Sequence, residues 1–592
     1  MKLSKFKMLG LSLTLSVLAG TVGGHSSYAA EAKDALTPVK PESGYFVDNY
    51  KNNTKDNMSA TSNPAIGVLS GFEKLWTPGA TWDSGTAVNA KILDQNIQMV
   101  IDIAKKRTAS QAQAAYLDDR RNQSYSVIEG LGSLTDVYRK DAGATTTITD
   151  VPADATTQKY DDGGNNAGDP NSSLGSVVSL VNKLRGDYSS TNPAKSFFNY
   201  KRPFRWDSPA IVIPTLVPQI KSDPTSDGGF PSGHTNAAYL SGFAMAYAMP
   251  ERYQELLTRA SELGNNRIVA GMHSPFDVMG GRVMATALSA AILNDPANKE
   301  LKKQAYQQAQ KVLMTQTGTA PDRFSDYKAN KKMYTERLTY QFPQVYAKNQ
   351  PIAVPKGAEV LLETRQPYLS DNQRRAVLAT TGIPSGYPVL DDAEGWGRLN
   401  LFAAADGYGA FMSNVTVTMD AYKGGFNQED HWRNAIAGKG GLIKKGTGTL
   451  YLEGKNTFSG NTTVMQGTLE GTTATAFGRG NVTNQGGTLA EQTAGMWTID
   501  GDFKQTPKGT LELNIGSKAD LLKIKGKASY NGKLQLNFTN NYVPANGMKI
   551  VINKKSVQHG QFSSMTTTGL PKGYSVKAIY SNTSVKLKVS KK

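Results

Sequence analysis

The sequence contains no cysteine in its 592 residues. A disulfide-linked scaffold, a zinc or iron–sulfur site with cysteine ligands, and a thiol nucleophile are therefore excluded. Histidine is scarce, with five residues in the whole chain. No run of about 18 uninterrupted apolar residues follows the N-terminal segment, so no membrane-spanning helix is expected after it. The length exceeds the roughly 150 residues of a typical domain several-fold, so at least two domains are expected.

The N-terminal segment has the pattern of a secretory signal peptide. Three lysines within the first seven residues precede an apolar run over 8–24, and the small residues Ser27 and Ala29 follow it. Such a pattern is typical of a cleavable export signal. We expect residues 1–29 to be removed and the mature protein to be secreted or associated with the cell surface.

Acidic residues are missing from the C-terminal end, where none follows Asp520. The net charge is +17, and the residues from Ala421 onward contribute +14 of it, whereas residues 30–420 are neutral in sum. A neutral body with a basic appendage favours contact with an anionic cell-envelope polymer over nucleic acid. A solvated basic face that serves solubility is the alternative.

Apolar residues recur at helical spacing through much of the chain before residue 320. The polar stretch 141–171 is expected to be a long loop, and no structure is predicted for most of 301–420. The predicted helices cover 94–106, 110–131, 174–188, 235–249, 252–263, 275–293 and 302–313.

After Gly438 the composition shifts to glycine, threonine, asparagine and alternating β-formers. The triplet Gly-Thr-Leu recurs from Gly448 at intervals of 19, 20 and 22 residues, and Gly532-Lys533-Leu534 continues the series after 23 more. This period fits one coil of a parallel β-helix per repeat, in which the leucines are buried when coils stack. Residues 441–460 also resemble the passenger-associated repeat of autotransporters.

Three segments concentrate residues that suit phosphate chemistry. Two of the five histidines, His234 and His273, lie in these segments, and they are the only histidines in the neutral body. Lysine and arginine supply fixed positive charge for a phosphoryl group, arginine through paired donors. The three segments are Lys195 with Arg202-Pro203, Pro231-Ser232-Gly233-His234, and Arg267 with His273 and Asp277.

Each of the last two segments also has the pattern of a helix start. Ser232 can cap a helix that begins near His234, and Gly233 allows an anion to approach the free N–H groups of that helix. Ser274 can cap a second helix, with Asp277 at the capping-box position. Asp277 either serves this cap alone or also accepts a hydrogen bond from His273 and fixes its tautomer.

Together, the three segments resemble the signature of the phosphatidic acid phosphatase type 2 superfamily, over about residues 90–295. The stretch 263–273 is similar to the secreted bacterial class A acid phosphatases. Two residues differ from the family pattern: Asn266 stands where serine usually precedes the arginine, and Ser274 stands where the acid phosphatases often have tryptophan.

The resemblance implies an all-α phosphatase domain that uses no metal and no other cofactor. It implies that His273 attacks phosphorus to form a phosphohistidine, with Asp277 orienting it, while His234 protonates the leaving group and then activates water. Phosphate-binding roles fall to Lys195, Arg202, Ser232, Gly233 and Arg267. A neutral His273 and a protonated His234 predict a bell-shaped pH profile with an acidic to near-neutral optimum.

The expected fold is therefore a multidomain chain, an all-α phosphatase domain followed by an all-β, parallel β-helix-like domain. We place the phosphatase domain at 30–420, a linker at 421–437 and the β-helix-like domain at 438–592. Small phosphomonoesters are the expected substrates. Two alternatives remain open: a vanadium-dependent haloperoxidase, which shares the anion site, and a surface adhesin with a vestigial phosphatase domain.

Overall fold

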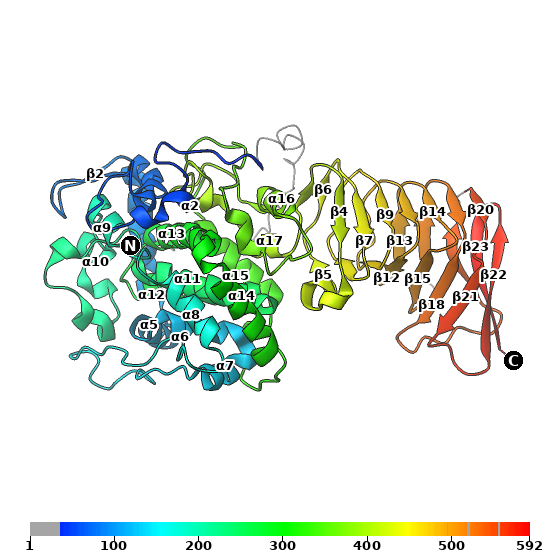
Figure 1. Ribbon diagram of the computed structural model, residues 1–592, viewed down its shortest axis with the longest axis horizontal. Helices are drawn as coiled ribbons and strands as arrows, with labels where there is room; N and C mark the ends of the chain where they lie inside the picture. Colours follow the sequence, from blue (N-terminus) through cyan, green and yellow to red (C-terminus); the bar gives the residue numbers. More distant parts are fainter. Residues whose placement is uncertain (1–35, 494, 518–520, 555–556, 592) are drawn as a thin grey trace, which may run out of the picture.

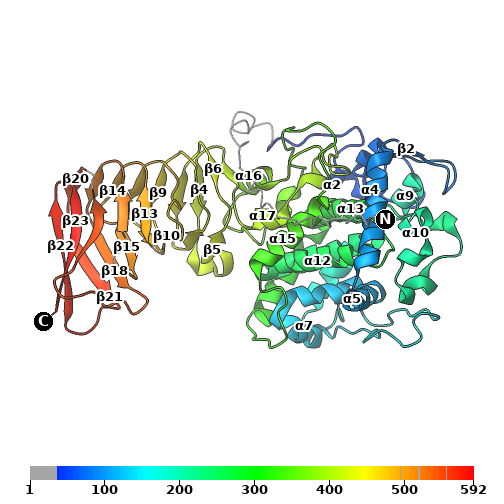
Figure 2. The ribbon, with the colours of Figure 1, turned by 180° about the vertical axis from the view of Figure 1, so that it is seen from behind.

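The computed structural model describes residues 36–493, 495–517, 521–554 and 557–591. It consists of a helical N-terminal domain and a parallel β-solenoid that extends away from it in one direction (Figure 1; Figure 2 shows the opposite side). The expected fold class is confirmed. The predicted signal peptide, 1–29, lies outside the described residues.

The helical domain is built around α11 (Gly233–Ala248) and α13 (Pro275–Asn294). Both helices carry small and apolar residues on every side and are buried almost throughout, as expected for helices at the centre of a domain. Among the described residues, α13 is the one helix long and apolar enough to cross a membrane, and its apolar stretch is wholly buried inside the domain. The N-terminal ends of these two helices contribute to the candidate site.

Other helices surround this pair (Figure 1). The longer ones are α4 (Ala90–Lys106), α5 (Ala109–Arg120), α7 (Thr135–Ala142), α8 (Gly175–Leu184), α12 (Tyr253–Val269), α14 (Lys299–Gln308), α15 (Tyr327–Thr339) and α16 (Asp371–Thr381). The shorter ones are α2 (Phe46–Asn49), α3 (Pro64–Gly67), α6 (Gln123–Val127), α9 (Asn192–Phe198), α10 (Pro203–Trp206) and α17 (Leu401–Ala405).

Most of the predicted helices are present, but the one predicted over 110–131 is not continuous. α5 ends at Arg120, and Asn122 caps the separate helix α6 by accepting a hydrogen bond from the Ser124 N–H at 2.9 Å. A 3₁₀ segment, 128–134, follows. No apolar residue lies between Leu117 and Tyr125, so the helical periodicity on either side did not show where the break falls. The expected loop over 141–171 is confirmed, since no helix or strand lies between 143 and 174.

The solenoid consists of two parallel seven-stranded sheets, with one strand of each sheet in every complete coil (Figure 1). The first sheet contains β5 (Glu429–Trp432), β8 (Thr449–Leu452), β10 (Thr468–Gly471), β12 (Thr488–Glu491), β15 (Thr510–Ile515), β18 (Lys533–Phe538) and β21 (Ser564–Thr568). The second contains β4 (Val415–Thr418), β7 (Leu442–Lys445), β9 (Thr462–Val464), β11 (Val482–Asn484), β14 (Phe503–Gln505), β17 (Ala528–Tyr530) and β20 (Gln558–Gly560).

The Gly-Thr-Leu repeat predicts the register of the first sheet correctly. The threonines of successive repeats pair with one another, and the leucines do the same in the adjacent position. The fifth repeat continues the register with Lys533 and Leu534. The buried leucine ladder consists of Leu450, Leu469, Leu489, Leu511 and Leu534. Each leucine therefore loses its contact with water only because the neighbouring coils are present.

An antiparallel sheet ends the solenoid. It consists of β19 (Lys549–Lys554), β23 (Ser584–Lys591) and β22 (Tyr574–Ser581), in that order. Two further strands, β13 (Met496–Ile499) and β16 (Leu521–Ile524), pair in parallel along the side of the coils. Strand pairing therefore changes from parallel to antiparallel at this end of the solenoid.

The solenoid starts earlier than the boundary predicted at 438. β4 already pairs with β7, and the segment predicted as a linker, 421–437, contains β5, which pairs with β8. Asp430 of β5 points inward and is buried against the helical domain, where it forms an ion pair with Arg365 at 2.8 Å and accepts a hydrogen bond from Tyr368. Helices and solenoid thus share one continuous core.

Candidate active site

The N-terminal turn of α11 forms one wall of the site. Ser232 is buried, and its Oγ accepts hydrogen bonds from the N–H of Thr235 at 3.3 Å and from the Thr235 hydroxyl at 3.0 Å. The predicted helix cap is therefore confirmed. Gly233 and His234, the first two residues of the helix, are half-buried. The free N–H groups of this turn carry partial positive charge, which favours an anion beside them.

The N-terminal turn of α13 holds the second histidine. Ser274 and Asp277 form a complete capping box, in which the Ser274 N–H donates to Asp277 Oδ2 at 2.8 Å. The same carboxylate oxygen lies 3.1 Å from His273 Nδ1. Asp277 therefore serves both purposes that the sequence left open: it caps the helix and it holds a proton on Nδ1 of His273, which leaves Nε2 with its lone pair.

Two cations from the segment before α11 place positive charge near His273. Arg202 donates from Nη1 to His273 Nε2 at 2.9 Å and to the carbonyl of Met272 at 3.0 Å. Its Nε pairs with Asp227 at 2.7 Å, which fixes the guanidinium plane. Lys195 donates to the Gly228 carbonyl at 2.7 Å. Both cations stand where they can meet an anion bound to His273.

Asp119 of α5 connects His234 to Arg267. The carbonyl oxygen of Asp119 lies 3.2 Å from His234 Nε2, and its carboxylate forms an ion pair with Arg267 of α12. Arg120 also contacts this carboxylate, at 3.1 Å. Sequence reasoning missed Asp119, because two adjacent aspartates in a polar helix carry no local signal of a partner 148 residues away.

The two helix starts are joined directly. The Ser232 N–H donates to the backbone carbonyl of Asp277 at 2.8 Å. Gly281 of α13 packs so closely on α11 that a Cβ there would lie 2.6 Å from the Ser232 carbonyl. All eight predicted site residues therefore belong to one small region: Lys195, Arg202, Ser232, Gly233, His234, Arg267, His273 and Asp277.

The charges and burial of this region shift the pKa values of its titratable groups. Burial, together with the Arg202 charge, lowers the pKa of His234 to about 3 and holds the pKa of His273 well below its usual range. Burial also lowers the pKa of Lys195 to about 7 and raises the pKa of Asp277 to about 6. Both histidines are therefore neutral near pH 7 unless negative charge is added beside them.

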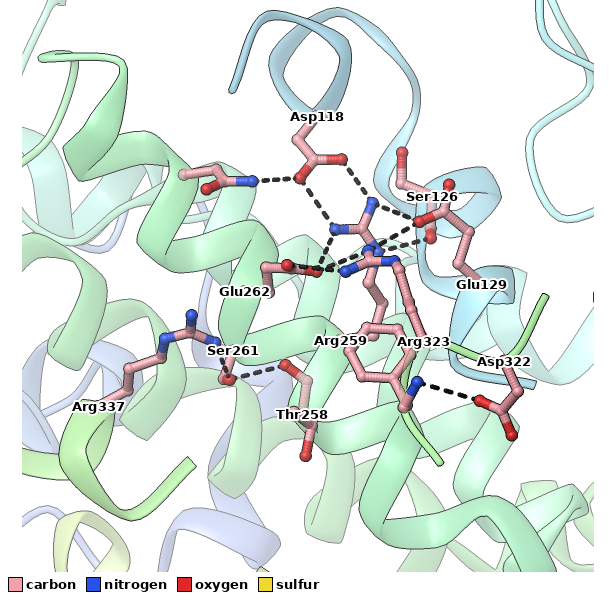
Figure 3. A network of polar contacts seen from close by, with 12 residues as sticks. Asp118, Ser126, Glu129, Thr258, Arg259, Ser261, Glu262, Asp322, Arg323 and Arg337 are labelled. Atoms are coloured by element: carbon pink, nitrogen blue, oxygen red, sulfur yellow. Dashed lines mark hydrogen bonds and ion pairs between the residues drawn. The ribbon is translucent and has the colours of Figure 1, made fainter. Parts of the chain in front are cut away.

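The two residues that depart from the family pattern have structural roles. Ser274 caps α13, as described above. Asn266 donates to Asp118 at 2.6 Å and so joins the buried ion network that ties α5 to α12. In that network Arg259 binds Asp118 through two nitrogens and Glu262 at 2.8 Å (Figure 3). Because Asp119 is the next residue of α5, the network also fixes the element that contacts His234.

Residues 176–300 match the PAP2 superfamily. The match spans α8 to the start of α14 and includes every residue of the site described above except those contributed by α5. This chain carries a PAP2 superfamily domain. The chain is similar to the non-specific acid phosphatase of Salmonella typhi, with 35% identity over 126 residues, covering 21% of this chain and 49% of that protein.

The solenoid that follows the PAP2 domain also has relatives. Residues 442–470 match the passenger-associated transport repeat, as the sequence predicted. The chain is 31% identical over 210 residues to the Neisserial autotransporter lipoprotein NalP of Neisseria meningitidis, covering 30% of this chain and 18% of that protein. An extracellular serine protease of Serratia marcescens is 33% identical over 144 residues, 19% of this chain and 14% of that protein. The chain thus spans about half of the acid phosphatase and less than a fifth of the other two.

Proposed function

We propose that this protein is a secreted or surface-associated acid phosphatase that hydrolyses phosphomonoesters through a phosphohistidine intermediate, without a metal ion. The observation that carries the proposal is the orientation of His273. Its Nδ1 is held by Asp277 and its Nε2 faces Arg202, so that an unprotonated nitrogen meets a cation that can neutralise a phosphoryl group. The PAP2 match and the acid phosphatase relatives support the same conclusion.

In the first step, His273 Nε2 forms a bond to phosphorus as the bond from phosphorus to the leaving oxygen breaks. His234 gives a proton to that oxygen. In the second step, His234 takes a proton from water, the water oxygen bonds to phosphorus, and the bond to Nε2 breaks. Asp277 keeps the proton on Nδ1 of His273 throughout and stabilises the positive charge that the ring acquires.

The proton on His234 depends on the substrate in this scheme. Burial and, after it, the neighbouring cations hold the pKa of His234 near 3, so this ring is neutral in the absence of an anion. A phosphomonoester dianion bound between Lys195 and Arg202 adds two negative charges close by and raises that pKa. His234 is therefore protonated in the enzyme–substrate complex, where it gives its proton to the leaving group.

Lys195, Arg202, Arg267, Ser232 and the Gly233 N–H are assigned to the phosphoryl oxygens. Arg202 and Arg267 are already oriented by Asp227 and Asp119, so little ordering is needed when an anion binds.

The proposal is tested by hydrolysis of an aryl phosphate in the presence of a chelator. We expect activity from the wild type and from the control His559→Ala, and none from His273→Ala. His559 is an exposed histidine of the solenoid.

Vanadate-dependent halide oxidation would favour the haloperoxidase alternative instead. An inactive wild type from pH 4 to 8, with no halide oxidation, would favour the adhesin. The relationship to autotransporters fits a location outside the cell for either function.

We further propose that the basic end of the solenoid binds an anionic envelope polymer. Lysines of the later coils and of the antiparallel end sheet are exposed, among them Lys523, Lys527, Lys533, Lys577 and Lys588. Sedimentation of the full chain with isolated cell walls tests this role. Binding that decreases as salt increases supports it, and no binding at low salt contradicts it.

A further inference from the structure

Two cations near the catalytic histidines have no carboxylate within ion-pair distance among the described residues. Lys195 is one, and the scheme above assigns it to the phosphoryl group. The other is Arg185, which follows the last residue of α8 and has no assigned role. The remaining cations of the site are paired: Arg202 with Asp227, Arg267 with Asp119, and Arg120 with Asp119 and Asp161.

Arg185 is linked through Ser124 of α6 to the face of α11 that carries His234. Its Nη1 donates to Asn122 Oδ1 at 2.6 Å and to Ser124 Oγ at 2.8 Å. Ser124 Oγ in turn lies 2.9 Å from Ser241 Oγ. Ser241 follows His234 by seven residues, which places the two side chains on one face of α11, two turns apart.

The residues after Arg185 stay beside α11. Asn236, in the first turn of that helix, donates to the carbonyl of Ser189 at 2.8 Å. The segment 185–189 therefore follows the helix toward its N-terminal end, where the candidate site lies. The Arg185 charge accordingly reaches His234 and contributes to lowering its pKa.

The guanidinium of Arg185 is held by one nitrogen only. The hydrogen bonds from Nη1 fix its position, while Nε and Nη2 make no hydrogen bond to a described residue, and the side chain is only half-buried. Burial without a counter-charge lowers the pKa of Arg185 to about 10, which still leaves it positively charged at neutral pH. An arginine anchored in this way presents two donors to a planar anionic group such as a carboxylate.

We propose that Arg185 binds a second anionic group on the leaving-group side of the substrate. The inference rests on the proposed function, because His234 is the residue assigned to protonate the leaving group. The favoured substrates are then phosphomonoesters whose alcohol portion itself carries a carboxylate or a phosphate. Arg185 is a specificity-determining residue that contacts this group and takes no part in breaking the ester bond.

The test compares kcat/KM for phenyl phosphate with that for 3- and 4-carboxyphenyl phosphate. For the wild type we expect at least one carboxylated ester to be preferred about tenfold, as a charge-assisted hydrogen bond at a half-exposed site provides. Arg185→Gln reduces this preference to about one. Arg185→Lys keeps the positive charge but lacks the paired guanidinium donors, so it retains part of the preference. Lys183→Gln removes one exposed charge from the same helix and leaves the preference unchanged.

The outcomes separate the two proposals. If the wild type hydrolyses all three esters equally well and Arg185→Gln changes no ratio, the inference is wrong and the phosphatase proposal stands. If Lys183→Gln abolishes the preference as well as Arg185→Gln does, the preference reflects the general field of the domain, and the assignment to Arg185 is also wrong. If the wild type hydrolyses none of the esters, the proposed function itself fails, and the inference fails with it.

Discussion

Replacing Asp277 by asparagine removes one negative charge from the site while keeping the shape of the side chain. Both hydrogen bonds to Asp277 end on the same oxygen, Oδ2, at 3.1 Å from His273 Nδ1 and 2.8 Å from the Ser274 N–H. An asparagine carbonyl in that position still accepts both. The substitution therefore preserves the helix cap and removes the charge beside His273, while the amide nitrogen takes the place of Oδ1, which is buried with no hydrogen-bond partner among the described residues.

The magnitude follows from what the charge does in the reaction. The ring of His273 becomes positively charged when it bonds to phosphorus, and Asp277 is buried beside it. A hydrogen bond to a charged group contributes about 1.5–3 kcal/mol, roughly twice the value for a neutral pair. Interaction with the developing ring charge adds to the difference, so we expect a loss of about 2–3 kcal/mol. That corresponds to a decrease in kcat of about 30- to 160-fold.

The assay is steady-state hydrolysis of an aryl phosphate by Asp277→Asn, with thermal unfolding recorded on the same samples. Asp295→Asn is the matched control, because Asp295 follows the last residue of the same helix and caps the next turn. The control should retain the wild-type kcat. A kcat for Asp277→Asn within threefold of the wild type, in a folded protein, would refute the assignment of His273 and Asp277.

The pH dependence and the solenoid give two further predictions. Asp277 loses its charge as the pH falls through about 6, and Lys195 loses its charge as the pH rises through about 7. We therefore expect kcat/KM to be greatest between these values and to decline on both sides. Lys195→Arg should extend activity to higher pH, and an alkaline decline that this variant does not move would contradict the role of Lys195. Leu489→Ala should lower the free energy of unfolding of the solenoid by about 2–5 kcal/mol, recorded through the fluorescence of buried Trp497, with kcat unchanged; an unaltered denaturation midpoint would contradict the leucine ladder.

Local patterns predicted the parts of this protein that depend on local physics. The caps at Ser232 and Ser274 were evident because each involves a backbone N–H three residues away. The register of the solenoid was evident because the same three residues recur in every coil. In both cases the interacting groups are either close in sequence or related by a period.

Contacts between distant segments were not predictable in this way. Asp119 and Arg185 contact residues on other helices, and the sequence around each of them does not indicate these contacts. The early start of the solenoid was missed for a related reason. β5 has Asp430 at an inward position, and its partners Arg365 and Tyr368, more than 60 residues earlier, make a buried aspartate tolerable there.

The proposal that His273 carries the phosphoryl group is tested most directly by isolating the intermediate. Wild-type protein mixed with an aryl phosphate labelled on phosphorus, quenched in alkaline denaturant and digested, should carry label on the peptide that contains His273. His559→Ala should be labelled equally, and His273→Ala should be neither labelled nor active. Label on another residue, or hydrolysis that persists in His273→Ala, would contradict the account.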